Sequence, residues 1–183
     1  YQPYELALSS KVVDIVKNYK IDLLHVHYAI PHAFAAYMAK KMLEDEGVFI
    51  PMITTLHGTD ITLVGSHPFY KKAVQFSINN SEYVTAVSQS LKEDTERLFK
   101  IKKEIKVIPN FIDSEKYSSR TVPCDNGFLN KENQTIITHI SNFRPLKRVI
   151  DVIKIYEKIH LKFNSKLLMV GDGPDKEKAK RYC

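Results

Sequence analysis

The sequence has only two cysteines, Cys124 and Cys183, and no apolar run long enough to cross a membrane. Two cysteines cannot staple a chain of 183 residues, so they favour a reducing, cytoplasmic setting over a disulfide scaffold. A membrane-spanning helix needs about 20 apolar residues in succession, and the longest runs here are the size of a strand. No secretory leader is visible. We expect a piece of a longer protein, because the chain begins at Tyr1 and the helical pattern of 175–182 is cut short.

Charge of one sign is not concentrated either. The net charge is +6, and the lysines are scattered along the chain in pairs. Glu93, Asp94 and Glu96 break up the basic surface further. A nucleic-acid-binding protein would show a denser basic stripe interleaved with aromatic residues, so a small anionic ligand fits the charge better. Apolar residues make up 44% of the chain, which excludes intrinsic disorder and suffices for one core or for one core and part of another.

Short apolar runs alternate with longer amphipathic segments, and this alternation predicts an α/β fold with parallel sheets. The polar, aperiodic stretch 113–134 predicts a connection between two domains. Ser90 and Glu93 have the spacing of a capping box at a helix start. Strands are expected at 21–27, 52–56, 83–87, 105–108, 135–140 and 166–170; helices are expected at 5–19, 31–46, 68–79, 90–99, 147–163 and 175–182.

Polar residues or glycines follow every predicted strand. Ligands bind beyond the carboxyl ends of the strands in open parallel sheets, so these residues predict a single cleft. The candidate catalytic residues are His57, Arg144 and Lys147, and the candidate substrate-binding residues are Tyr28, Gly58, Thr59, Asp60, Ser88, Asn110, Asn142, Gly171 and Gly173.

The segment 57–60 follows the second predicted strand with the sequence HGTD. His57 can donate to a substrate hydroxyl or act as acid or base near neutral pH. Gly58 allows the backbone to approach a ligand closely. Thr59 and Asp60 offer a polar fork; the alternative is a turn in which Asp60 caps the next helix.

Three cations, Arg144, Lys147 and Arg148, stand near a predicted helix start. The first turn of a helix already favours anions, so cations there suggest a doubly charged ligand such as a pyrophosphate. The alternative is a set of solvated surface cations. Gly171 and Gly173 could admit a nucleotide, although a plain turn would explain them equally well.

Two histidines, His25 and His27, share one face of the first predicted strand. Their ring nitrogens could be satisfied by backbone carbonyls. A metal-dependent hydrolase built on these two with His57 and Asp60 is an alternative. No cysteine joins the group, and the spacing matches no closed zinc motif.

Segments at 23–33, 54–65, 84–91, 107–113, 139–148 and 167–174 occur in an order that resembles the retaining family-4 glycosyltransferases. The resemblance implies the GT-B type of α/β fold, in which two Rossmann-like domains face a cleft, both of them incomplete in this chain. On that template, residues 1–119 form most of the N-terminal acceptor-binding domain, 120–132 a connecting segment, and 133–183 the start of the sugar-nucleotide-binding domain. The family's Gly-rich loop is expected before Tyr1 and its Glu pair after Cys183.

The resemblance further implies a hexosyltransferase that moves N-acetylglucosamine from UDP-GlcNAc to L-malate in bacillithiol biosynthesis, with no cofactor and no metal. His57 and Lys147 match family positions, whereas Arg144 stands two residues after the family's Arg. The alternatives are a different acceptor or a non-catalytic nucleotide-sugar-binding module. The expected partners are the two small-molecule substrates, with no nucleic acid and no membrane span, and a homo-oligomer stays open.

Overall fold

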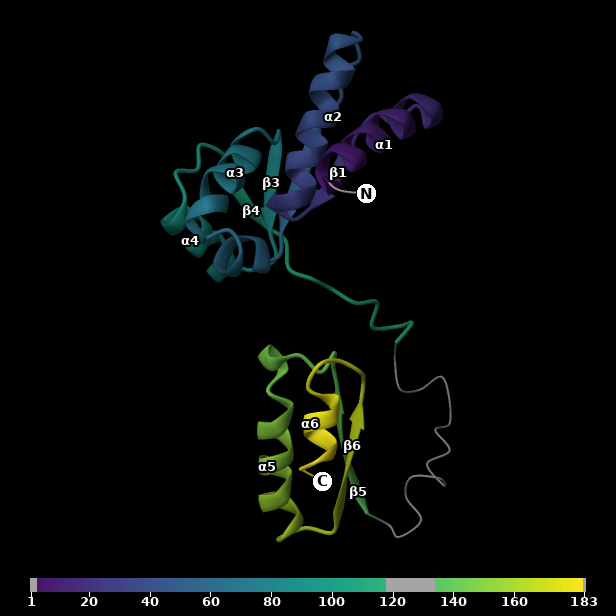
Figure 1. Cartoon of the computed structure of the whole chain (residues 1–183), viewed down its shortest axis with the longest axis vertical. Coiled ribbons are helices and arrows are strands. Elements are labelled where there is room, and N and C mark those ends of the chain that lie inside the picture. The colour runs from purple at the N-terminus through teal and green to yellow at the C-terminus, as the bar shows by residue number, and fades with distance from the viewer. Residues whose placement is uncertain (1–2, 118–133, 183) are drawn as a thin grey trace. The chain divides into compact units, whose positions relative to one another are not determined.

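The computed structural model describes residues 3–117 and 134–182 (Figure 1). The chain divides into two compact units, Tyr1–Asp113 and Ser114–Cys183, which are described separately. The predicted connecting segment 120–132 lies outside the described residues. Within the described residues, no helix is long and apolar enough to span a membrane.

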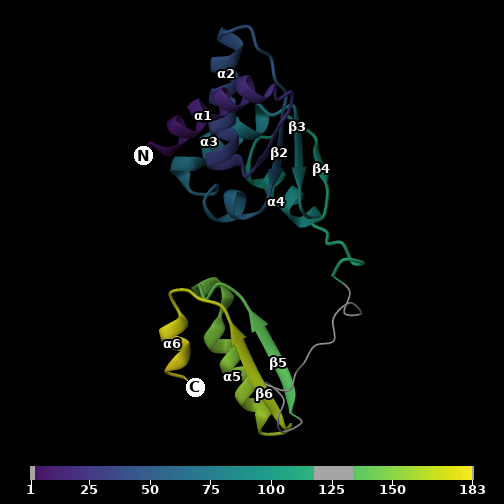
Figure 2. The same ribbon diagram turned by 90° about the vertical axis from the view of Figure 1, so that its right-hand side faces the viewer.

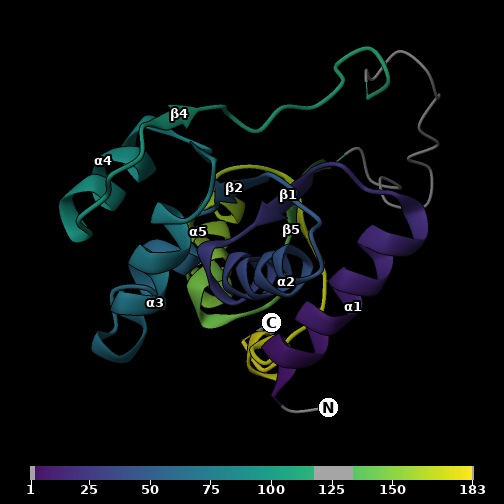
Figure 3. The same cartoon turned by 90° about the horizontal axis from the view of Figure 1, so that it is seen from above.

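The first unit is built on a parallel sheet with the strand order β1-β2-β3-β4. Figure 2 shows α1, α2 and α3 on one side of these strands, and Figure 3 shows α1 beside α2. The strands are β1 (Leu24–His27), β2 (Met52–Leu56), β3 (Tyr83–Ala86) and β4 (Ile105–Val107); the helices are α1 (Tyr4–Tyr19), α2 (Phe34–Asp45), α3 (Pro68–Asn79) and α4 (Gln89–Leu98), with single π-helical turns η1 (Ala29–Ala33) and η2 (Thr59–Leu63).

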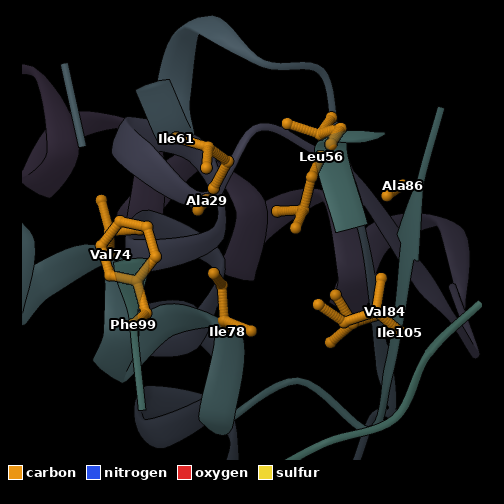
Figure 4. Packing of buried hydrophobic residues seen from close by; sticks show 10 residues of the cluster. Ala29, Leu56, Ile61, Val74, Ile78, Val84, Ala86, Phe99 and Ile105 are labelled. Carbon is orange, nitrogen blue, oxygen red and sulfur yellow. The ribbon is translucent and has the colours of Figure 1, made fainter. Parts of the chain in front are cut away.

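The core of the first unit lies on the helix-covered face of the sheet. In β2, Met52, Thr54 and Leu56 are buried, whereas Ile53 and Thr55 between them are only half-buried. This alternation follows from the period of two along a strand. Figure 4 shows the apolar side chains that pack together here, among them Leu56, Ile61, Val74, Ile78, Val84, Phe99 and Ile105. The opposite face carries the residues that matter for the site.

The second unit contains a pair of parallel strands, β5 (Thr135–Ile140) and β6 (Ser165–Val170). The 3-10 turn η3 (Pro145–Lys147) leads into α5 (Val149–His160), and α6 (Lys176–Lys180) follows β6. Phe143, Val149, Ile153 and Ala179 form its small core. The predicted α/β class with parallel sheets is therefore confirmed in both units.

Two helix starts differ from the predictions by more than one residue. The helix expected from residue 31 begins at Phe34, because η1 precedes it with Ile30 in extended conformation. The helix expected from residue 147 begins at Val149, because Arg148 adopts a left-handed conformation (φ 50°) that ends the 3-10 turn. Hydrophobic periodicity does not detect such local changes of helix type.

The predicted capping box at Ser90 and Glu93 is also wrong. The N-cap of α4 is Ser88, whose Oγ accepts a hydrogen bond from the Leu91 N–H at 3.2 Å. Ser88 Oγ also lies 3.1 Å from Ser90 Oγ. A serine two residues upstream thus satisfies the free N–H of the first turn.

A partly buried ion pair joins α2 to the start of β3. Lys40 is only 7% exposed, and its Nζ lies 2.6 Å from Glu82 Oε1. Glu82 Oε2 accepts a second hydrogen bond, from the Met52 N–H at 2.6 Å. Burial raises the pKa of Glu82, but the hydrogen bonds from Lys40 and Met52 outweigh it, so this pKa lies below its ordinary value.

We expect Glu82→Ala to lower the free energy of unfolding by about 2 kcal/mol, because it leaves a buried ammonium without its partner. Glu46→Ala, which removes a half-exposed partner of Lys17, is the matched control and should change stability by about 0.5 kcal/mol or less. Because the folded pKa of Glu82 is lowered, its contribution is complete above the ordinary carboxyl pKa and declines as the pH falls through the folded value. Urea unfolding of both variants at pH 7 and pH 4 checks this. Equal effects of the two substitutions would contradict it.

Candidate functional site

The loops that follow β1 and β2 are held together by one buried carboxylate. Asp60 is 2% exposed, and its Oδ2 accepts a hydrogen bond from the Ala29 N–H at 2.8 Å. Its Oδ1 accepts from the Gly58 N–H at 3.0 Å and from the His57 N–H at 3.3 Å. The carboxylate therefore points into the protein backbone, and it fixes both loops at the carboxyl edge of the sheet.

Tyr28 adopts a strained backbone conformation at the end of β1, with φ 75°. Such conformations cost about 1–3 kcal/mol in a non-glycine residue and persist only where neighbouring contacts enforce them. Here the Tyr28 N–H donates to the Thr55 carbonyl at 2.9 Å, and the Tyr28 carbonyl accepts from the Ala33 N–H at 3.1 Å. This backbone conformation places the centroid of the Tyr28 ring 4.9 Å from the centroid of the His57 ring.

His57 lies in a row of aromatic rings. Its Nε2 is 2.7 Å from His27 Nδ1, and the two ring centroids are 5.0 Å apart. The His25 ring stacks on His27 at 4.7 Å. Burial lowers the pKa of His57, and the charges of His27 and His25 lower it further, while Asp60 acts in the opposite direction. This shift favours the neutral form of the His57 imidazole.

An open groove of about 990 Å³ runs along the sheet face opposite the core. His25, His27, Thr55 and Thr85 contribute to its lining, and Asn110 lies in its wall. His25 Nε2 is 2.9 Å from Thr55 Oγ1, which is 2.8 Å from Thr85 Oγ1. The register places His27, Thr55 and Thr85 directly beside one another, so β1, β2 and β3 together form a polar floor.

The cation loop of the second unit, 144–148, lies between β5 and α5. Arg144 and Lys147 are exposed, and within residues 134–182 neither side chain forms an ion pair. Arg148 differs, because its Nε lies 2.5 Å from Asp151 Oδ2 one turn along α5. Arg144 and Lys147 are thus available to an anion, whereas Arg148 is engaged within the helix. Asn142 is exposed two residues before Arg144.

Gly171 and Gly173 are required by the packing of two loops. A Cβ on Gly171 would lie 1.8 Å from the Ser141 carbonyl oxygen, and one on Gly173 would lie 2.8 Å from backbone atoms of Phe143. The loops are also joined by hydrogen bonds from the Phe143 N–H to the Asp172 carbonyl at 2.8 Å and from the Asp175 N–H to the Phe143 carbonyl at 2.9 Å. This packing accounts for both glycines without a ligand, and their binding role stays a prediction.

The structure thus places the predicted residues in two groups. Tyr28, His57, Gly58, Thr59 and Asp60 gather at the ends of β1 and β2. Asn110 lies along the groove, and Ser88 serves as the α4 cap. The other predicted residues, Asn142, Arg144, Lys147, Gly171 and Gly173, lie in the second unit.

The direct hydrogen bond between His27 and His57 and the polar floor of Thr55 and Thr85 were not predicted from the sequence, which grouped the two histidines only as possible metal ligands. The signal for the polar floor that the sequence did offer was the alternation along β2, which places Thr55 on the same face of the sheet as Ile53. The metal alternative gains no support: among residues 3–117 and 134–182, no three His, Cys, Asp or Glu side chains converge to hold an ion. Asp60, one of its four proposed ligands, is occupied by backbone N–H groups.

Comparisons with known proteins agree across most of the chain. The family described as Glycosyltransferase Family 4 matches residues 1–116. The N-acetyl-alpha-D-glucosaminyl L-malate synthase of Bacillus anthracis is 47% identical over 176 residues, which are 96% of this chain and 45% of that protein. The putative teichuronic acid biosynthesis glycosyltransferase TuaC of Bacillus subtilis (strain 168) is 25% identical over 186 residues, 96% of this chain and 44% of that protein. The chain spans less than half the length of either relative.

Solved structures show the same fold. Sucrose-phosphate synthase from Thermosynechococcus elongatus matches with a TM-score of 0.64 at 15% identity, over 99% of this chain and 47% of that chain. Anabaena Alr3699/HepE in complex with UDP and glucose matches with a TM-score of 0.64 at 19% identity, over 96% of this chain and 46% of that chain. These matches show the fold of this chain, and the predicted GT-B type of α/β fold is confirmed.

Proposed function

The chain belongs to glycosyltransferase family 4, and from this we propose that the full-length protein is a retaining hexosyltransferase that transfers N-acetylglucosamine from UDP-GlcNAc to L-malate. The observation that carries the proposal is the 47% identity to an N-acetyl-alpha-D-glucosaminyl L-malate synthase over 96% of this chain. The product would be the α-glycoside of malate, the first intermediate of bacillithiol biosynthesis, with UDP released. The small number of cysteines favours a cytoplasmic enzyme.

In this proposal the two units bind different substrates. Residues 1–119 form most of the acceptor-binding domain, and residues 133–183 begin the sugar-nucleotide-binding domain. The difficult step is the departure of UDP, during which negative charge builds up on its phosphate. Arg144 and Lys147 are exposed cations without ion pairs in the described part of the second unit, and they would stabilise that charge where it develops.

The acceptor side is formed by the residues around His57. His57 can exchange a hydrogen bond with a sugar or malate hydroxyl, and Tyr28 and Thr59 flank it. The only carboxylate of the described HGTD loop, Asp60, is taken up by backbone N–H groups and cannot act as a nucleophile. Retention without such a nucleophile calls for attack of the malate hydroxyl on the face from which UDP leaves. No step of this scheme requires a metal or a cofactor.

Product analysis tests the proposal. The full-length protein is incubated with UDP-GlcNAc and, separately, with L-malate, inositol phosphate and simple sugars, and the products are identified by mass. We expect UDP and N-acetylglucosaminyl malate only with L-malate. A product with a different acceptor would leave the family assignment intact and overturn the substrate, whereas binding of UDP-GlcNAc without any turnover would indicate a non-catalytic binding module.

We expect His57→Ala to lower kcat about 10²-fold, since a positioned acid, base or hydrogen-bond donor contributes about 10²–10⁴-fold. The melting temperature should stay within a few degrees, because the His57 side chain is only half-buried. His67→Ala, which removes an exposed histidine at the start of α3, is the control for turnover; it also removes the N-cap acceptor of the Phe69 N–H, so its own melting temperature should fall slightly. Steady-state kinetics and thermal melts of both variants decide the matter. A large loss of stability with a proportionate loss of activity would assign His57 a structural role instead.

A further inference from the structure

The ring of His57 is held by a second histidine 30 positions earlier in the chain. His57 Nε2 lies 2.7 Å from His27 Nδ1, which is the distance of a hydrogen bond between two ring nitrogens. His27 is fixed in turn, because it is the last residue of β1 and its register partner is Thr55. Its carbonyl accepts a hydrogen bond from His32 Nδ1 at 2.8 Å. The partner of His57 is therefore part of the sheet, not of a loose loop.

Ring contacts restrict His57 from two sides. The His27 ring lies at 5.0 Å with an interplanar angle of 38°, and the Tyr28 ring lies at 4.9 Å with an angle of 43°. Rotation of the His57 ring would break the hydrogen bond and displace both contacts. One orientation is therefore strongly preferred before any ligand arrives.

A hydrogen bond between two imidazole nitrogens requires one shared proton, because one nitrogen donates and the other accepts. Nε2 of His57 is used in this bond. Nδ1 of His57 has no hydrogen-bond partner among residues 3–117 and 134–182. Only this second nitrogen can meet a ligand.

We infer that His27 is a positioning residue: it engages Nε2 of His57 and so presents Nδ1 of His57 to the sugar or to the hydroxy-acid acceptor. The inference about catalysis rests on the proposed function, whereas the hydrogen bond does not. When His27 donates the shared proton, Nδ1 of His57 carries a hydrogen and can donate to a substrate oxygen. When His57 donates it, Nδ1 is bare and can accept a hydroxyl proton. His27 thus connects the protonation of one ring to the chemistry available on the other.

Two substitutions separate a hydrogen-bonding role from a packing role. His27→Phe keeps a ring at the end of β1 and removes the nitrogen, whereas His27→Asn removes the ring and keeps a polar atom near the position of Nδ1. We expect kcat to fall about 10-fold or more in His27→Phe, because losing the orientation of a catalytic side chain commonly lowers the rate by at least this factor. In His27→Asn, kcat should stay within about threefold of the parent value. A packing role predicts the reverse order.

Nuclear magnetic resonance of the full-length protein with ¹⁵N-labelled histidine supplies a readout independent of turnover. We expect a downfield ring N–H proton shared by the His27–His57 pair, lost in His27→Phe. It should persist in His25→Phe, which alters the neighbouring ring that bonds to Thr55 and not to His57. Absence of this proton in the parent, or its survival in His27→Phe, would overturn the hydrogen bond.

The two readouts also separate this inference from the proposed function. If the proton behaves as expected but no acceptor is glycosylated, the proposed function fails and the His27–His57 pair stands. If sugar transfer occurs and His27→Phe loses the proton without any change in kcat, the positioning role of His27 is overturned while the proposed function stands.

Discussion

Replacing Lys147 by alanine in the full-length protein is expected to lower kcat about 100-fold, because removal of one fixed positive group that stabilises transition-state charge commonly costs this much. Lys147 ends η3 two residues before the start of α5 at Val149, is exposed, and forms no ion pair within residues 134–182. Its charge is therefore available to a departing phosphate. Because this charge matters most in the transition state, KM for UDP-GlcNAc should change less than kcat.

Lys158→Ala provides the matched control, since it removes the same charge from the exposed last turn of α5. Turnover measured at saturating UDP-GlcNAc should separate the two variants by about two orders of magnitude. Near-parental turnover of Lys147→Ala would class Lys147 with the solvated surface cations. Arg144→Ala tests whether Arg144 replaces the family's upstream arginine, in which case its loss is comparable.

The largest expected effect on stability belongs to Asp60→Ala. Three N–H groups, those of Ala29, His57 and Gly58, lose their acceptor at once, and the site is almost fully buried. An unsatisfied buried polar group costs about 1–3 kcal/mol, so we expect the free energy of unfolding to fall by about 3 kcal/mol or more. Asp60→Asn, which retains one acceptor oxygen, should lose less.

Chemical denaturation of the full-length protein measures this difference. Asp22→Ala removes an exposed aspartate just before β1 and should change stability by about 0.5 kcal/mol or less. Turnover should fall with Asp60→Ala as well, because Tyr28 and His57 both depend on the loops that Asp60 joins. An unchanged denaturation midpoint would show that water or other groups satisfy the three N–H groups.

Much of the fold could be predicted from local pattern. The strand at 52–56 alternates buried and half-buried positions, and the observed β2 has the same bounds. The rule that ligand sites lie beyond the carboxyl ends of parallel strands also predicted that Tyr28 and His57 lie at one edge of one sheet, because parallel strands end on the same side. Helix boundaries at Phe34 and Val149 were less predictable, since one π-helical or 3-10 turn shifts a start without changing the apolar pattern.

The partners of the site residues were decided by tertiary structure alone. Asp60 offers the same carboxylate whether it caps a helix, contacts a ligand or joins two loops, and only the fold brings Ala29 within 2.8 Å of it. His27 and His57 are adjacent because β1 and β2 pair in parallel, which the sequence expresses only as two separate motifs. Gly171 is required because the Ser141 carbonyl approaches it from another loop. The sequence by itself determined which residue types stand at the strand ends; the hydrogen-bond partner of each was selected by side-chain rotamers and loop packing between segments distant in the chain.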